Sequence, residues 1–275
     1  MWIRYAAIFA AGVTVPIVAG AQTDYFNTDR GRPLYVQDAY AIERYAFELQ
    51  AAPIRWSRAN GRSIWSVEPE LAYGIFPRTQ FEVGIPIVRA DSFDGGAKTS
   101  LGALHVSVLH ALNVETLGLP ALALSAAYSA PIGDFGPPRG YPTLGALATR
   151  TTSLGRLHLN AEFAIGGDVP ADDEVWESSR AVGLEEVSRW LVGAAIDRTL
   201  PLRSMLFGAE VLARQPIREG SSVQWEVATG MRWQLDPLWS LDAGLGHSFG
   251  PENEWSLTFG AARSFGLIHF MPLNR

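Results

Sequence analysis

The stretch Ser63–Ile75, SIWSVEPELAYGI, alternates between two kinds of side chain. One parity holds the larger apolar residues Trp65, Val67, Pro69, Leu71, Tyr73 and Ile75, and the other holds Ser66, Glu68, Glu70, Ala72 and Gly74. Successive side chains of a β-strand point to opposite faces, whereas the helical period of about 3.6 residues would mix the two sets. The stretch therefore predicts a strand with one apolar and one polar face.

The same alternation recurs along the chain from about Tyr45 onward. It is clear in 80–87, 157–166 and 223–233, and less regular near 43–56, 100–112, 120–130, 187–198, 204–214, 239–249 and 254–265, with a weak candidate near 143–151. About twelve strands result, an even number as in bacterial barrels made from one chain. Proline lacks a backbone donor, so we expect bulges or breaks at Pro53, Pro69 and Pro86.

The connections between these strands are of two kinds. Four are short, namely Phe76–Thr79, Thr152–Gly155, Leu200–Arg203 and Leu235–Leu238. Intervening ones are longer or more polar, namely Arg89–Thr99, Ile132–Tyr141 and Gly167–Glu186. Outer-membrane barrels have short periplasmic turns and longer extracellular loops. Strand parity and loop length therefore predict one fold, an all-β, transmembrane antiparallel up-and-down β-barrel.

The composition fits this fold and disfavours others. The chain has 275 residues, 48% of them hydrophobic and 18% charged, with no cysteine and a mean hydropathy of +0.07. No uninterrupted apolar run reaches the length of about 18 residues that a membrane helix needs after the N-terminal region. The net charge of −6 argues against a nucleic-acid partner, which would require a basic face.

The N-terminus predicts export. Arg4 gives a positive start, Tyr5–Gly20 is apolar, and Ala19-Gly20-Ala21 has the small residues that signal peptidase requires. We therefore expect residues 1–21 to be a signal peptide. The alternative is an uncleaved anchor, which Pro16 would disturb.

The cost of placing charge in lipid predicts which strand face meets the membrane. Arginine or lysine on the lipid face costs about 2–4 kcal/mol at the bilayer midplane, and acidic residues cost less. The polar parity should therefore face the lumen. His110, His247 and Arg263 break the parity, but they lie near strand ends and can reach the interface.

A soluble β-sandwich is the rival fold, because its strands alternate too. Tryptophan placement favours the barrel. The tryptophans that lie near predicted strand ends, where an aromatic girdle would meet the lipid interface, are Trp56, Trp65, Trp190, Trp225, Trp233, Trp239 and Trp255. Strands are enriched in aromatic residues in any setting, so the sandwich stays open as an alternative.

The polar parity supplies a set of candidate lumen-lining residues. They are Arg44, Glu48, Glu68, Glu70, Glu82, His105, His158, Asn160, Glu162, Arg189, Glu210, Glu226, Arg232 and Asp242. The carboxylates can form a path that prefers cations or polar solutes, with Arg44, Arg189 and Arg232 as counter-charges. We favour a sealed lumen in which acid–arginine pairs satisfy one another. A dozen strands lie between the filled interior of about eight and the aqueous pore of about sixteen.

Neither catalysis nor metal binding is predicted. His105 shares a strand face with Ser107, and His158 shares one with Asn160. Residues two apart on a strand lie about 6–7 Å apart along the backbone, and nucleophilic catalysis needs hydrogen-bond reach plus an orienting group. The acidic loop residues 172–174 lack the spacing of a calcium loop. We expect no catalytic residue and no cofactor, and a lipid-modifying hydrolase is the least favoured alternative.

Several short motifs carry a family resemblance. They are Gly31-Arg32-Pro33-Leu34 followed by Asp38-Ala39-Tyr40 and Glu43-Arg44, then FEVGIP at 81–86, His158-Leu159-Asn160 and Gly244-Leu245-Gly246. These segments resemble the outer-membrane transporter family known as MetA-pathway of phenol degradation. On the fourth strand, Gly102-Ala103 and Leu109 stand where that family has Gly-Asp and a later Lys, so a route lined by those charges would be altered here.

The resemblance implies a porin-like channel or transporter in the bacterial outer membrane. Its partners would be membrane lipid and a small solute, aromatic or otherwise apolar, that crosses passively. A sealed structural or interaction barrel, which acts through its extracellular loops, is the alternative function.

Residues 22–40 precede the first predicted strand, and the barrel itself is expected over 41–275. The segment carries Asp29, Arg30, Arg32 and Asp38, so it is too polar to face lipid, although it contains the apolar run Pro33–Val36. It is either a loose periplasmic tail, as chain ends usually are, or a plug-like insert that pairs with lumenal glutamates. We expect the insert, which would partly occlude the periplasmic mouth.

Overall fold

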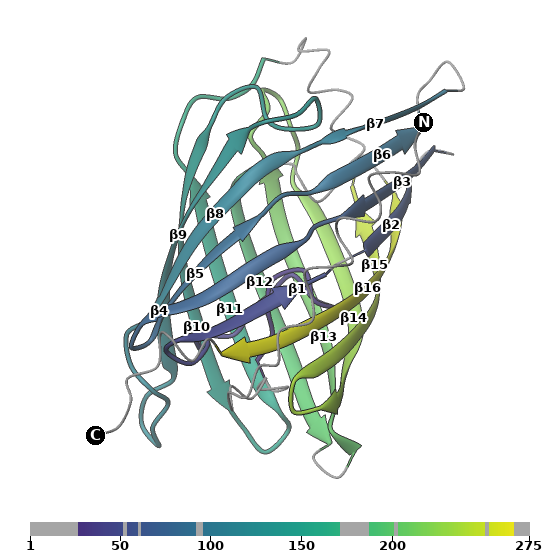
Figure 1. The fold of residues 1–275 in the computed structure, drawn as a ribbon. Coiled ribbons are helices and arrows are strands. Elements are labelled where there is room, and N and C mark those ends of the chain that lie inside the picture. Colours follow the sequence, from purple (N-terminus) through teal and green to yellow (C-terminus); the bar gives the residue numbers. More distant parts are fainter. Residues whose placement is uncertain are drawn as a thin grey trace.

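The alternating segments form one antiparallel sheet that closes into a barrel in the computed structural model of the protein (Figure 1). The structure describes residues 27–51, 54–59, 62–91, 96–170, 187–200, 203–250 and 253–266. The signal peptide expected at 1–21, Pro53 and the acidic loop residues 172–174 lie outside these ranges. Among the described residues, no helix is long and apolar enough to cross a membrane.

The described sheet contains sixteen strand segments. They are β1 (Ala46–Gln50), β2 (Ile54–Ala59), β3 (Arg62–Val67), β4 (Glu70–Phe76), β5 (Thr79–Gly84), β6 (Ile87–Asp91), β7 (Ala97–Leu101), β8 (Ala103–Ala111), β9 (Ala121–Pro131), β10 (Tyr141–Thr151), β11 (Arg156–Ala164), β12 (Ser188–Leu200), β13 (Met205–Pro216), β14 (Gln224–Asp236), β15 (Trp239–Phe249) and β16 (Glu254–Gly266).

Twelve traverses of the barrel wall account for these sixteen segments. The first four traverses are each interrupted once, between β1 and β2, β3 and β4, β5 and β6, and β7 and β8. Pro69 and Pro86 lie at two of these interruptions, where the missing N–H cannot extend the ladder. The barrel closes through β16, which pairs with β1 at Phe47–Phe265 and with β2 at Trp56–Leu257. The predicted strand count and the predicted breaks at these two prolines are confirmed.

The outer face of the barrel is apolar. Leu159, Trp255 and Phe259 are each more than half exposed, whereas the residues that alternate with them are buried inside. His247 stacks against Trp255, and the guanidinium of Arg263 lies over the Trp239 ring. Two of the three parity exceptions, His247 and Arg263, therefore lie among aromatic residues, as expected at the interface of a lipid-facing surface. A soluble sandwich would not expose such a belt.

The two ends of the barrel differ. We call the end that carries the connections 77–78, 152–155, 201–204 and 237–238 the short-turn end, although the connection 112–120 there is longer. The opposite long-loop end carries the connections 92–96, 132–140, 165–187 and 217–223. At the long-loop end, Phe135 folds back into the barrel and packs on Ile64, Val88 and Ala90.

Candidate functional site

The interior of the barrel contains a stretch of the chain's own N-terminal region. We call residues 27–42, which precede β1, the lumenal segment (Figure 1). Its apolar side chains Leu34, Val36 and Ala39 are buried against the inner wall. Since a bilayer would be outside the wall, this burial takes place within the lumen.

Two buried arginines tie the lumenal segment to the wall. Arg32, with a fully buried side chain, contacts Asp242 of β15 at 2.8 Å and Glu48 of β1 at 3.0 Å. Arg232 of β14 donates to Asp242 at 2.6 Å and to Asp29 of the segment at 3.1 Å. Burial alone would lower the pKa of Arg32, but these carboxylates outweigh it and hold that pKa above its ordinary value. The arginine therefore stays charged in the lumen.

Polar wall side chains also accept hydrogen bonds from the backbone of the segment. Glu210 of β13 accepts from the N–H groups of Tyr35 and Val36, at 2.9 and 2.8 Å. Asn160 of β11 accepts from the N–H of Gln37 and donates to its carbonyl oxygen. An extended chain has no partner strand here, so these side chains satisfy backbone groups that burial would otherwise leave unpaired.

A third anchor contains an arrangement that looks catalytic at first sight. Thr149 Oγ1 lies 3.0 Å from His158 Nδ1, and His158 Nε2 lies 3.0 Å from Asp197. The hydroxyl oxygen of Thr149 also accepts the Ala39 N–H at 2.9 Å, and Thr149 is fully buried. A nucleophile must reach its substrate. The lumenal segment covers the Thr149 hydroxyl, so Thr149, His158 and Asp197 serve to hold the segment.

Asp38 joins the same anchor through Arg156, whose guanidinium lies 3.5 Å from the Asp38 carboxylate and 2.6 Å from Asp197. The Thr28 N–H also donates to Asp38, at 3.1 Å. Burial raises the pKa of Asp38 to about 6, against the opposing effect of the Arg156 charge. The docked segment therefore contains a carboxyl group that titrates close to neutral pH.

Glycines of the inner wall make room for the segment. A β-carbon on Gly193 would lie 2.5 Å from Val36, one on Gly208 2.7 Å from Leu34, and one on Gly230 2.4 Å from Pro33. Real side chains do not approach so closely, so a side chain added at one of these glycines would collide with the native residue of the segment that faces it. The inner wall is therefore shaped to hold a chain, and wall side chains alone do not fill this part of the lumen.

A cavity of about 110 Å³ lies beside the segment, and we call it the lumenal chamber. The segment contributes Arg30, Gly31 and Tyr35 to its lining. The wall residues that line it are Glu68, Glu70, Glu82, Pro86, Ala103, His105, Ala127, Ser129, Thr143, Glu162, Val187, Ser188 and Leu191. Val187 ends the longest connection and Ser188 begins β12, so the chamber lies toward the long-loop end.

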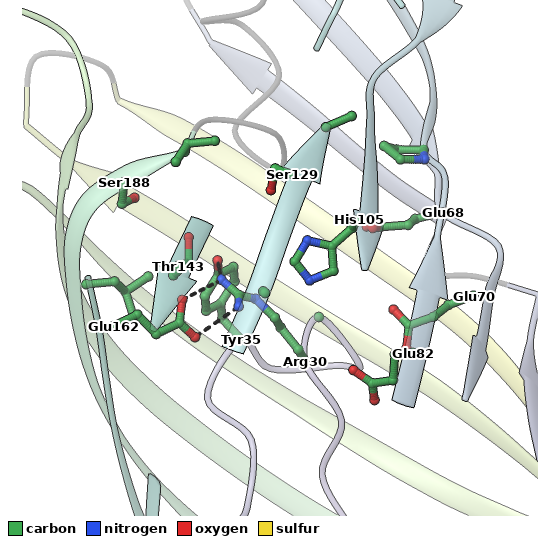
Figure 2. A pocket seen from close by; sticks show the side chains of 16 residues that line it. Arg30, Tyr35, Glu68, Glu70, Glu82, His105, Ser129, Thr143, Glu162 and Ser188 are labelled. Carbon is green, nitrogen blue, oxygen red and sulfur yellow. Dashed lines mark hydrogen bonds and ion pairs between the residues drawn. The ribbon is translucent and has the colours of Figure 1, made fainter. Parts of the chain in front are cut away.

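Charged groups occupy two sides of the lumenal chamber (Figure 2). Arg30 makes two bonds of 2.9 Å to Glu162 and lies over the Tyr35 ring. Glu68, Glu70 and Glu82 come from the other side (Figure 2). Of these, Glu82 accepts a hydrogen bond of 2.7 Å from Ser107. The chamber therefore combines one neutralised arginine with three further carboxylates.

Most of the lumen-lining candidates lie inside the barrel. Those that contact the lumenal segment are Glu48, Asn160, Glu162, Glu210, Arg232 and Asp242, and those that face the chamber are Glu68, Glu70, Glu82, His105 and Glu162. His158 holds the segment through Thr149, and Glu226 pairs with Arg55 at 4.0 Å.

Two candidates lie elsewhere. Arg44 precedes β1, is exposed and stacks on Tyr45, so the structure does not place it as a lumenal counter-charge. The strand expected from residue 43 begins only at Ala46, after a turn. Arg189 is at the long-loop mouth, where it binds the carbonyl oxygens of Ala164 and Gly166 and pairs with Asp168.

Sequence reasoning missed Arg156, which contacts Asp38 of the segment, and Gly193, which makes room for Val36. It also missed Asp197, which holds Arg156 and His158 in place. Asp197 lies on the inward parity of its strand, which was a usable signal. Gly193 carried no comparable signal, because a glycine at an inward position does not reveal what it faces.

Comparison with solved structures shows the fold. The crystal structure of an outer-membrane channel from Pseudomonas putida F1 superimposes with a TM-score of 0.56 at 16% identity, and the match covers 86% of this chain and 100% of that one. The chain has the fold of an outer-membrane β-barrel. No family model and no curated protein match it at a significant level.

Two looser superpositions complete this comparison. The KdgM porin matches with a TM-score of 0.46 at 12% identity, over 80% of this chain and 99% of that one. The outer membrane phospholipase A from Escherichia coli matches with a TM-score of 0.44 at 9% identity, over 90% of this chain and 98% of that one.

Proposed function

We propose that the protein is a gated channel through which small solutes cross the outer membrane passively. The observation that carries the proposal is how the lumen of the barrel is closed. The lumen is closed by a separate stretch of chain, which noncovalent contacts hold against a glycine-containing wall. Removing that stretch would leave a passage where wall side chains do not meet.

The position of the lumenal chamber within the barrel also supports a channel function. It lies toward the long loops, and Arg30, Gly31 and Tyr35 of the segment form part of its lining. If the long loops are extracellular, as their lengths predict, a solute would enter the chamber and stop against the segment. Displacement of the segment would then complete the route to the periplasm.

A sealed structural barrel is the second candidate function. The full burial of Arg32 between Asp242 and Glu48 favours it, because breaking such a network is costly. The proposal that the solute is aromatic or apolar rests on the family resemblance alone. The same holds for membership of that family, and cleavage of a signal peptide rests on the N-terminal pattern.

Ion conductance in planar bilayers tests the proposed function. The full-length protein should show rare openings, and a variant without residues 22–36 should show a persistently larger conductance, because Arg30, Arg32 and the apolar contacts are gone. Heat-modifiable mobility on gels would establish that the deleted barrel has assembled. An assembled deletion variant with unchanged conductance would leave the sealed barrel as the function.

A further inference from the structure

We propose that the lumenal chamber binds small organic cations, and that solutes with an amino group are therefore its preferred ligands. The inference deepens the proposed channel function, since it names the class of solute that would pass. It depends on three features of the chamber, which are its charge balance, the partners of its carboxylates and its shape.

The formal charge of the side chains that line the chamber is negative. Its lining contains the carboxylates Glu68, Glu70, Glu82 and Glu162 and a single guanidinium, that of Arg30. Glu162 accepts two hydrogen bonds from that guanidinium, each 2.9 Å long, and the Tyr35 hydroxyl accepts a further one. In the part of the chain that the structure describes, the three carboxylates on the other side have no cationic partner in contact with them. A bound cation would supply that missing charge, whereas an anionic solute would meet repulsion.

The partners of these carboxylates are incomplete. Glu82 accepts only from neutral groups, the Ser107 hydroxyl and the Gln80 amide. Within the described residues, neither Glu68 nor Glu70 has a hydrogen bond or an ion pair. Carboxylates withdrawn from bulk water without donors are costly, so the site gains free energy when a ligand brings N–H groups.

The shape of the chamber brings two of the carboxylates together. A β-carbon on Gly84 would lie 3.3 Å from Glu68 Oε1 and 3.5 Å from Glu70 Oε2, so both groups converge over this glycine. The absence of a side chain there leaves the space between them open to a ligand. Figure 2 shows Glu70 and Glu82 on the side that faces His105 and Arg30.

An ammonium group fits this chamber better than a metal ion. No group of three or more acidic or histidine side chains in the described residues is arranged to hold a metal. An ammonium group carries three donors that can reach separate carboxylates. The volume of about 110 Å³ is several times what one water molecule needs, so a small organic body can enter as well. Ala103, Ala127 and Leu191 offer apolar wall to that body.

Three ligands of similar size separate charge from shape, namely benzylamine, benzyl alcohol and benzoate. Their binding to the detergent-solubilised full-length barrel can be measured by titration calorimetry at low ionic strength and neutral pH. We expect benzylamine to bind and benzoate not to bind. Glu68→Gln and Glu70→Gln should each weaken benzylamine binding by about fivefold, because each removes one attractive charge at close range.

Two further variants complete the design. Glu219→Gln removes the same charge from an exposed position in a loop at the same end of the barrel, and it should leave binding unchanged. Gly84→Ala keeps every charge but fills the space between the two carboxylates, so it should weaken benzylamine binding as well. Equal binding of benzylamine and benzoate, or no effect of Glu68→Gln and Glu70→Gln in folded protein, would overturn the inference.

The outcome separates this inference from the channel proposal, because equilibrium binding does not require conduction. Selective benzylamine binding in a barrel that never conducts would support the chamber and refute the channel. Conductance with equal permeability to cations and anions, together with absent benzylamine binding, would support the channel and refute the chamber.

Discussion

Replacement of Arg32 by methionine should release the lumenal segment from the barrel wall. Methionine keeps much of the side-chain volume but removes the charge that contacts Asp242 at 2.8 Å and Glu48 at 3.0 Å. Loss of one partner from a buried ion pair typically costs about 3–5 kcal/mol. Since about 1.4 kcal/mol is a tenfold change, the ratio of docked to released segment should fall by a factor of about a hundred or more.

Single-channel recording measures this ratio directly as the fraction of time spent open. The Arg32→Met variant should be open for most of the recording, and its segment should become sensitive to proteinase K in detergent. Arg203→Met is the matched control, because Arg203 is exposed at the short-turn end and should change neither reading. A correctly folded Arg32→Met barrel that stays closed and protease-resistant would refute the assignment of Arg32 as an anchor.

Three other changes test separate parts of the account. Gly230→Val would place a side chain where Pro33 lies, 2.4 Å from the first added carbon, so the open fraction measured in bilayers should rise, and an unchanged fraction would count against the docked position. Burial raises the pKa of Asp38 from 3.8 to about 6 in the docked state, so docking is favoured most below the ordinary pKa and weakens as pH rises through about 6. The open fraction of the native protein should therefore increase between about pH 4 and pH 7, and the equilibrium constant for docking should fall by up to about a hundredfold. Asp38→Asn should flatten this pH profile. A native profile that is flat or inverted would contradict the role of Asp38. The orientation of the barrel can be tested with single cysteines. A cysteine in place of Glu219 should react with an impermeant thiol reagent on intact cells, and one in place of Leu154 should not. The reverse labelling pattern would mean that the barrel has the opposite orientation in the membrane.

The wall of the barrel could be predicted from the sequence because one physical rule governs it. Every second side chain of a traverse faces lipid, and the cost of charge there keeps the two parities separate. The weak candidate near 143–151 became the regular strand β10, where Leu147 is buried inside together with Thr149 while Leu144 is exposed outside, so large apolar residues occur on both faces. Proline at 69 and 86 also gave a local signal that needed no knowledge of neighbouring strands.

The contents of the lumen could be predicted only in part. An inward glutamate has the same parity whether it holds a segment, as Glu210 does, or lines a cavity, as Glu70 does. The distinction depends on which distant residues meet it, and Arg32 is 210 positions away from Asp242. Arg44 was wrongly predicted to face the lumen, because the alternating pattern does not apply to the turn that precedes β1.

The central claim is that the lumenal segment is the barrier to solute flow, and a reversible cross-link tests it most directly. The chain has no cysteine, and a β-carbon on Gly193 would lie 2.5 Å from a methyl carbon of Val36, so the double variant Val36→Cys with Gly193→Cys brings two thiols within reach of a disulfide. If the segment is the barrier, the oxidised barrel never opens in planar bilayers and a reductant restores openings, while each single-cysteine variant does not respond to the reductant. Equal conductance of the oxidised and reduced double variant, with the disulfide verified by mass spectrometry, would contradict the claim.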